Sequence, residues 1–153
     1  MRIFRLFFPI LMGLAIASEQ AAYAQDKIEK TLSSFGYIIK QSYSVQPDAK
    51  EKEQYQTLAR RVIKIKSEKA VPRMSNTFYR FTVIEDQYAD AGSAKTSLSQ
   101  RGAPLVGGEP DALWKLLCTK FQYGKNVYFV TTDAGIFSDE MKRIAKALET
   151  SLR

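Results

Sequence analysis

The chain contains a single cysteine, Cys118, among its 153 residues, so no disulfide within the chain can hold its fold together. Small exported domains often depend on disulfides, whereas a chain without them must fold by burying apolar surface alone. The composition permits this, because 45% of the residues are hydrophobic and 12% are aromatic, which is too apolar for a disordered chain. We therefore expect a globular domain with a conventional hydrophobic core.

The first 24 residues have the three parts of a secretory signal peptide. Two arginines among the first five residues are followed by an uncharged apolar run over residues 6–17 and by Ala22-Tyr23-Ala24, an A-x-A cleavage site. The apolar run is shorter than the roughly 20 residues that span a bilayer, which favours cleavage over an uncleaved anchor. We expect cleavage after Ala24 and one soluble domain over residues 25–153, with no transmembrane segment left. The lack of disulfides fits a bacterial periplasm better than a eukaryotic secretory route, so we expect a bacterial protein that is periplasmic or secreted.

The positive charge of the chain is concentrated in one segment. The whole chain carries a net charge of +7, and residues 60–73 hold six cations and one anion. These cations are Arg60, Arg61, Lys64, Lys66, Lys69 and Arg73. Such a basic patch can bind an anionic lipid surface, an anionic envelope polymer or an acidic protein, although it can equally be a solvated helix face. Nucleic acid is not an expected partner of an exported protein.

The N-terminal half of the domain predicts two helices, each with a competing strand interpretation. Capping signals at Asp26 and Asp48 favour helices from residue 26 to about 43 and from residue 48 to about 66. Apolar residues also alternate over residues 37–45 and 63–65, as they would in strands. We prefer the helices, because more apolar positions follow the helical spacing, and the choice for residues 36–45 and 61–66 stays open.

The second half predicts the order β-α-β-β-α. Strands are expected at residues 79–83, 114–121 and 126–132, because apolar residues there alternate or form short runs. A weak helix capped by Asp90 precedes a loop over residues 101–110, and Ser138 is expected to cap a C-terminal amphipathic helix. The fold class is therefore α+β, with the N-terminal helices and the C-terminal helix packed on a small antiparallel sheet.

This order over residues 76–152 is similar to that of SPOR-type peptidoglycan-binding domains, although the glycine-containing strand signature and the final strand of that family are missing. The resemblance implies an exposed sheet face on which Trp114 and Tyr128 could contact a glycan. Both aromatic residues can equally belong to the core. Cys118, between them in the sequence, is expected to be a buried thiol, with an intermolecular disulfide as the alternative.

No catalytic, cofactor or metal site is predicted. The chain has no histidine, which removes the usual general base and the commonest zinc ligand. Acidic residues occur in three groups, around residues 85–90, 109–111 and 133–140, and carboxylate pairs can hydrolyse glycosides when a fold sets them about 5–10 Å apart. Capping and solvation of strand ends explain such residues equally well.

The sequence therefore favours a non-enzymatic periplasmic binding or protein-interaction module that uses its basic patch. Two alternatives stay open. One is an inhibitor or immunity-type protein that caps a secreted hydrolase or toxin, and the other is a cell-wall hydrolase that uses carboxylates. Neither the partner nor the oligomeric state follows from the sequence.

Overall fold

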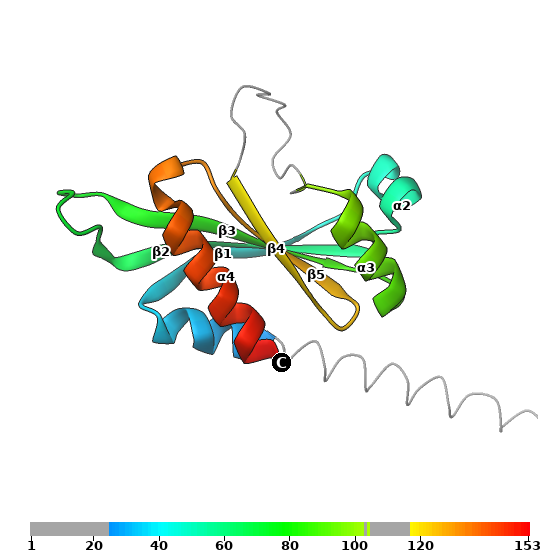
Figure 1. The fold of residues 1–153 in the computed structure, drawn as a ribbon, viewed down its shortest axis with the longest axis horizontal. Coiled ribbons are helices and arrows are strands. Elements are labelled where there is room, and N and C mark those ends of the chain that lie inside the picture. Colours follow the sequence, from blue (N-terminus) through cyan, green and yellow to red (C-terminus); the bar gives the residue numbers. More distant parts are fainter. Residues whose placement is uncertain (1–24, 103, 105–116) are drawn as a thin grey trace, which may run out of the picture.

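The computed structural model describes residues 25–102, 104 and 117–153 and consists of one five-stranded antiparallel sheet with helices on both faces (Figure 1). Residues 25–34 are helical. The other elements are β1 (Tyr37–Val45), α2 (Ala49–Tyr55), β2 (Ala59–Ala70), β3 (Phe78–Gln87), α3 (Ala91–Gln100), β4 (Leu117–Tyr123), β5 (Asn126–Thr132), a 3-10 turn (Gly135–Phe137) and α4 (Ser138–Leu152). The strand order is β1-β2-β3-β5-β4. The expected signal peptide and Trp114 lie outside the described residues. No helix in the described ranges is both long and apolar enough to span a bilayer.

The N-terminal half differs from the prediction of two long helices. The first helix ends before Gly36, which has a φ of +76°, and β1 follows it directly. The second helix is only α2, which ends at Tyr55 and is followed by its C-cap Gln56 in the left-handed conformation before β2 begins. The strand interpretation of residues 37–45 and 63–65 was therefore the correct one. Both segments pair with neighbouring strands, and this pairing outweighs a helical spacing within one segment.

The described residues of the second half match the predicted order in part: β3, α3, β4, β5 and α4 follow one another, a 3-10 turn precedes α4, and residues 114–116 of the predicted second strand lie outside the described residues. Asp90 caps α3 as expected, since its side chain accepts a hydrogen bond from the backbone N–H of Ser93 at 2.8 Å. The predicted cap of the last helix was wrong, because Ser138 is already its first residue and Phe137 occupies the N-cap position without a side-chain hydrogen bond. The α+β class with a C-terminal amphipathic helix stands.

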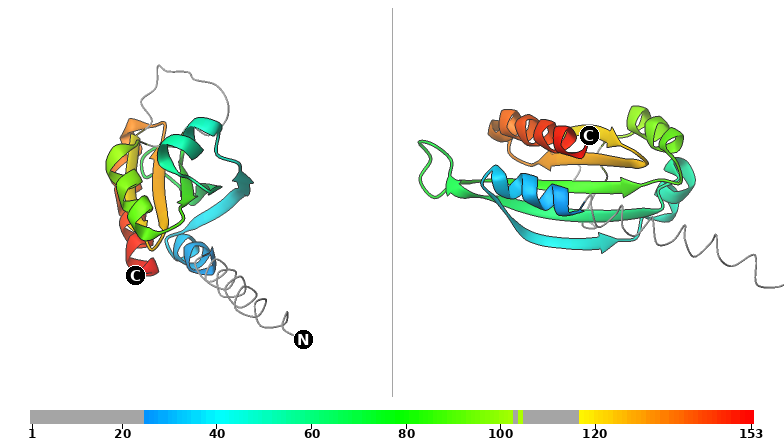
Figure 2. Two further views of the ribbon diagram at one scale, coloured as in Figure 1. Left: turned by 90° about the vertical axis from the view of Figure 1, so that its right-hand side faces the viewer. Right: turned by 90° about the horizontal axis from the view of Figure 1, so that it is seen from below.

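The main core lies between the sheet and the two helices at the ends of the domain. We call this side of the sheet the α4 face, and Figure 2 shows residues 25–34 and α4 next to one another on it. Strand residues at every second position point into this core, because successive side chains of a strand point to opposite faces of the sheet. They include Ile63, Ile65, Phe81, Val83, Tyr128 and Val130.

The opposite side, which we call the α3 face, carries a smaller core. Ile84, Val127 and Phe129 pack there against Tyr88 and Ala94. Cys118 is half-buried and packs against the same cluster. In Figure 1, α2 and α3 lie at one end of the strands, while the β2–β3 hairpin projects at the other. Among the described residues, helices therefore cover only one end of the α3 face.

A partly buried polar contact joins the first strand to the last helix. The hydroxyl of Tyr37 donates to Oε1 of Glu140 at 2.6 Å, and Arg143 donates to the same carboxylate from the next turn of α4. The hydrogen bond from Arg143 lowers the pKa of Glu140, burial opposes this shift, and the hydrogen bond from Tyr37 lowers it further. Because the folded pKa lies below its ordinary value of 4.5, the contact stabilises the fold above that pH.

Replacing Leu148 with alanine should destabilise the protein by about 2–5 kcal/mol, because the substitution leaves a cavity in a fully buried part of the main core. Urea unfolding followed by circular dichroism measures the change. Ile136→Ala is the control, since 69% of Ile136 is exposed and its truncation should shift the midpoint little. Equal shifts in both variants would contradict this assignment of the core.

Glu140→Gln should flatten the acid branch of the stability profile. In the wild type, the contribution of Glu140 is complete above pH 4.5 and is lost as the pH falls through the lower folded pKa. The difference in urea midpoint between pH 7 and pH 3 should therefore be smaller in the variant. Glu149→Gln, which removes an ion pair with the exposed Arg153 just after α4, should keep the wild-type difference.

Candidate functional site

The covered end of the α3 face contains a buried ion-pair network centred on Arg60. Its guanidinium group binds the Asp86 carboxylate through Nε and Nη2 at 2.6 and 2.8 Å. It also binds Glu51 of α2 through Nη1 and Nη2 at 2.8 and 2.7 Å. Asp86 lies directly opposite Arg60 in the pairing of β2 with β3, so the register itself brings the first pair together.

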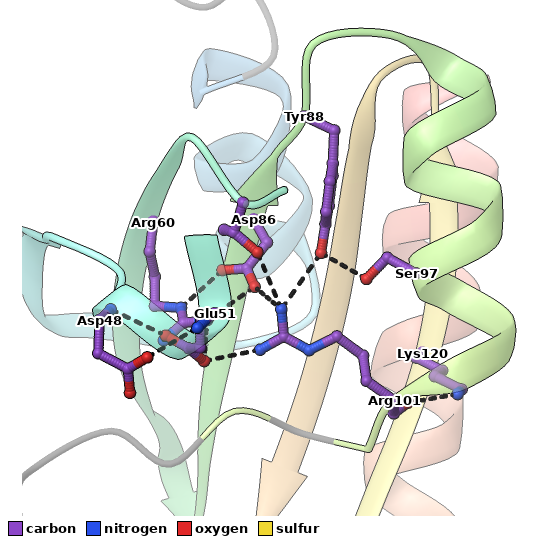
Figure 3. A network of polar contacts seen from close by, with 9 residues as sticks. Asp48, Glu51, Arg60, Asp86, Tyr88, Ser97, Arg101 and Lys120 are labelled. Atoms are coloured by element: carbon purple, nitrogen blue, oxygen red, sulfur yellow. Dashed lines mark hydrogen bonds and ion pairs between the residues drawn. The ribbon is translucent and has the colours of Figure 1, made fainter. Parts of the chain in front are cut away.

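Arg101, just after α3, completes this network (Figure 3). Its Nη2 lies 2.8 Å from Oε1 of Glu51, and its Nη1 lies 3.0 Å from Oδ2 of Asp86. The guanidinium carbon lies 4.6 Å from the ring centre of Tyr55 and 5.5 Å from that of Phe129. The network therefore joins α2, β2, β3 and the end of α3 into one unit.

The charges of the network balance one another, since two guanidinium groups face two carboxylates. Burial alone would lower the pKa of Arg60, but its hydrogen bonds with Asp86 and Glu51 outweigh burial and raise that pKa. Arg60, Arg101 and Asp86 are each at most 6% exposed. A set of groups that satisfy one another in this way has no charge left for a ligand, so we assign the network a structural role.

The uncovered end of the same face has the opposite electrostatic character. Side chains from β1, β2, β3 and β5, together with Asp133 just after β5, surround an open hollow of about 640 Å³, which we call the basic hollow. Its charged and hydroxyl-bearing residues are Lys40, Lys64, Lys66, Arg80, Thr82, Thr131, Thr132 and Asp133. Ile65 and Phe81 also border it, although their side chains belong to the core of the α4 face.

The four cations of the basic hollow form no salt bridge with any described residue. Lys66 lies directly opposite Arg80 in the pairing of β2 with β3, so two like charges face each other across neighbouring strands. Nζ of Lys66 lies 3.7 Å from the ring centre of Phe78, and Nζ of Lys64 lies 5.9 Å from that of Tyr43. These rings hold two of the ammonium groups by cation–π attraction without neutralising them.

The structure divides the predicted basic patch. Only Lys64 and Lys66 line the basic hollow, while Arg60 is committed to the buried network and Arg61 to Glu85 on the α4 face at 2.9 Å. The remaining two patch residues, Lys69 and Arg73, lie at and beyond the end of β2, and neither lines the hollow.

Tyr128 does not lie on an exposed sheet face. It is fully buried on the α4 face, and its hydroxyl donates to Oε1 of Glu85 at 2.7 Å. Burial raises the pKa of this hydroxyl, and the neighbouring carboxylate raises it further. The expectation of a glycan contact through Tyr128 was therefore wrong, because alternation along β5 turns its ring toward α4.

In the acidic groups around residues 85–90 and 133–140, the described residues serve as local partners with the exception of Asp133, which forms no salt bridge with a described residue. Glu85 and Asp86 point to opposite faces and bind Arg61 and Arg60, respectively, while Asp90 caps α3. The acids at positions 109 and 111 lie outside the described residues. Within the described ranges, no group of three or more acidic, cysteine or histidine side chains could hold a metal ion.

Comparison of the chain with protein-family models, with curated proteins and with solved structures gives no match in any of the three. The geometry of the described residues is therefore the basis on which a function can be argued.

Sequence reasoning did not identify Lys40 and Arg80 as cations of the basic hollow. Lys40 sits at a register irregularity of β1 between Ile39 and Gln41, and such bulges redirect side chains. Arg80 reaches the site only because β3 pairs with β2 in the observed register. Arg80 alternates with Phe81, which shows that its side chain points away from the main core. No local pattern shows which other cations lie beside it.

Arg60→Met should destabilise the protein by about 3–5 kcal/mol, because the substitution leaves the buried Asp86 with Arg101 as its remaining cationic partner. Chemical unfolding measured by intrinsic fluorescence gives the difference. Arg153→Met is the matched control, since the side chain of Arg153 is 69% exposed and its ion pair should contribute little. An Arg60 variant as stable as the control would rule out a structural role for the network.

Proposed function

We propose that this protein is a non-enzymatic binding module that holds an anionic ligand in the basic hollow. One observation carries the proposal, which is that four cations converge on a single hollow without a salt bridge to any described residue. An anionic ligand would supply the counter-charge that those residues do not.

The contrast within the same face supports this proposal. At one end, Arg60 and Arg101 are fully neutralised by Asp86 and Glu51. At the other end, Lys66 and Arg80 face each other, an arrangement that is destabilising when no anion lies between them. A solvated surface has no need to place two cations opposite each other at the wall of a hollow, whereas an anion-binding site does.

The cellular location belongs to the same proposal. The N-terminal pattern of charge, apolar run and A-x-A sequence supports export to a bacterial periplasm. Anionic polymers, anionic lipid headgroups and acidic proteins of the envelope are the ligand classes available there.

An inhibitor that caps an acidic protein is the second candidate. Ile38 and Tyr43 on the edge strand β1 are 41% and 37% exposed, and Ile38 lies opposite Lys66 of the basic hollow. Exposed apolar side chains next to unpaired cations favour a protein partner over a polymer. Such a partner would be retained at high salt, whereas a polymer held by charge alone would be released.

The double variant Lys66→Gln/Arg80→Gln should bind immobilised heparin, a sulfated polyanion, more weakly than the wild type. At about 1 kcal/mol for each cation, the loss is roughly 10- to 30-fold in affinity, and the protein should elute at lower salt. Lys125→Gln/Lys146→Gln is the control, because it removes the same charge from two exposed lysines outside the basic hollow. Equal loss in the two double variants would mean that net charge alone governs binding, and the proposal would fail.

A further inference from the structure

The cations of the basic hollow are arranged as a compact cluster. Lys66 and Arg80 occupy one cross-strand pair, whose Cβ atoms are about 4.5–5.5 Å apart in such pairs. Lys64 lies two residues along β2 on the same face, a step of about 7 Å, and Lys40 lines the hollow from the edge strand. Several positive charges can therefore reach one small anionic group or two adjacent ones.

The other side of the basic hollow carries hydroxyl groups and one carboxylate instead of cations. Thr82 lies directly opposite Lys64 on one side and opposite Thr131 on the other, so hydroxyl groups continue the row across the sheet. The hydroxyl of Thr82 has no hydrogen-bond partner among the described residues. Asp133 follows β5 at the same end, is exposed, and forms no salt bridge with the described cations.

This combination discriminates between anionic ligands. A single carboxylate can be bound by one guanidinium group and would leave the three lysines unneutralised. Asp133 would weaken the binding of a polymer that presents only negative charge, although the four cations would still attract it. A phosphate carries nearly two negative charges and three acceptor oxygens in a small volume, and hydroxyl groups beside it could donate to Asp133 and share hydrogen bonds with the threonines.

From the cationic side and the hydroxyl-bearing side together, we infer that the basic hollow binds a phosphate monoester or diphosphate attached to a polyhydroxylated group, such as a sugar or glycerol unit. This inference rests on the proposed function and specifies its ligand class. Lys66, Arg80 and Lys64 hold the phosphate, while Asp133 and Thr82 hold hydroxyl groups of the attached unit. A volume of about 640 Å³ lies within the range of about 300–1,000 Å³ that is usual for small-molecule sites.

Titration calorimetry of the purified protein at low salt tests the inference with three soluble probes. Glucose 1-phosphate and glucuronate share a hydroxylated ring and differ in the anionic group, while pyrophosphate has the charge without the ring. We expect glucose 1-phosphate to bind at least tenfold more tightly than glucuronate. Lys66→Gln/Arg80→Gln should weaken glucose 1-phosphate by at least tenfold, and Lys125→Gln/Lys146→Gln should leave it unchanged.

The variant Asp133→Asn tests the role of the carboxylate in the basic hollow separately from that of the cations. Removing this carboxylate should strengthen the binding of pyrophosphate, because a repulsive charge is lost. It should leave glucose 1-phosphate unchanged or weaken it, because the acceptor for its hydroxyl groups becomes poorer. An equal gain for both probes would overturn the role of Asp133 and with it the requirement for a hydroxylated ligand.

The outcomes also separate this inference from the proposed function. Equal affinity for glucuronate and glucose 1-phosphate, both lost in Lys66→Gln/Arg80→Gln, would refute phosphate selectivity and leave anion binding in place. Glucose 1-phosphate bound equally well by that variant and by the wild type would refute the inference, because the site would lie elsewhere. If that variant also kept its wild-type retention on heparin, the proposed function would fail as well.

A second arm distinguishes a soluble ligand from a lipid headgroup with the same phosphate chemistry. Vesicles of phosphatidylcholine with phosphatidic acid present a phosphate monoester at a membrane surface. Co-sedimentation that glucose 1-phosphate displaces would support a lipid-borne phosphate in the basic hollow. Binding of glucose 1-phosphate without co-sedimentation would support a soluble or polymer-borne phosphate.

Discussion

The buried pairing of Arg60 with Asp86 and Glu51 determines how this sheet is covered. Arg60 is held from two sides by bidentate contacts, and a charge in that position requires both partners because water cannot replace them. Glu51 belongs to a helix of only seven residues that buries no side chain of its own. The ion pair, supported by Arg101, is therefore what keeps α2 on the sheet.

This anchoring also determines what is left open. With α2 and α3 fixed over one end of the α3 face, the other end has no described helix above it (Figure 1). β2 passes through both regions, so the same strand supplies the neutralised Arg60 and the unneutralised Lys64 and Lys66. The two ends of one face thus differ in electrostatic character, although the cations that β2 supplies to them, Arg60, Lys64 and Lys66, lie within six residues of one another in the sequence.

Sequence-based prediction succeeded where the signal lies within one segment, and it failed where the structure depends on pairing with other strands. The last helix and the strands of the second half were predicted because their own patterns of apolar residues are strong, and α4 indeed buries Met141, Ile144 and Leu148. Residues 37–43 and 59–66 were assigned to helices because apolar residues there fit both periods and more of them fit the helical one. Pairing of β1 with β2 and of β2 with β3 decides between helix and strand. The sequence of a single segment does not show which strands it will pair with.

The same limit applies to the candidate site. The run of cations over residues 60–73 was visible as composition, but the pleat of β2 sends Arg60 and Arg61 to opposite faces. Arg80 and Lys40 join the site through register and through a bulge, neither of which is encoded in the run itself. Composition could therefore suggest the proposed class of ligand, while the residues that line the proposed site follow only from the tertiary structure.

The facing pair of Lys66 and Arg80 has a consequence for how this protein would evolve. Two cations fixed opposite each other oppose folding, so a neutral or apolar residue at either position would make the empty protein more stable. Selection for stability alone would remove the pair, and selection for ligand binding would retain it. The ligated protein would then be the more stable form, and its resistance to unfolding in the cell would report how much ligand is present.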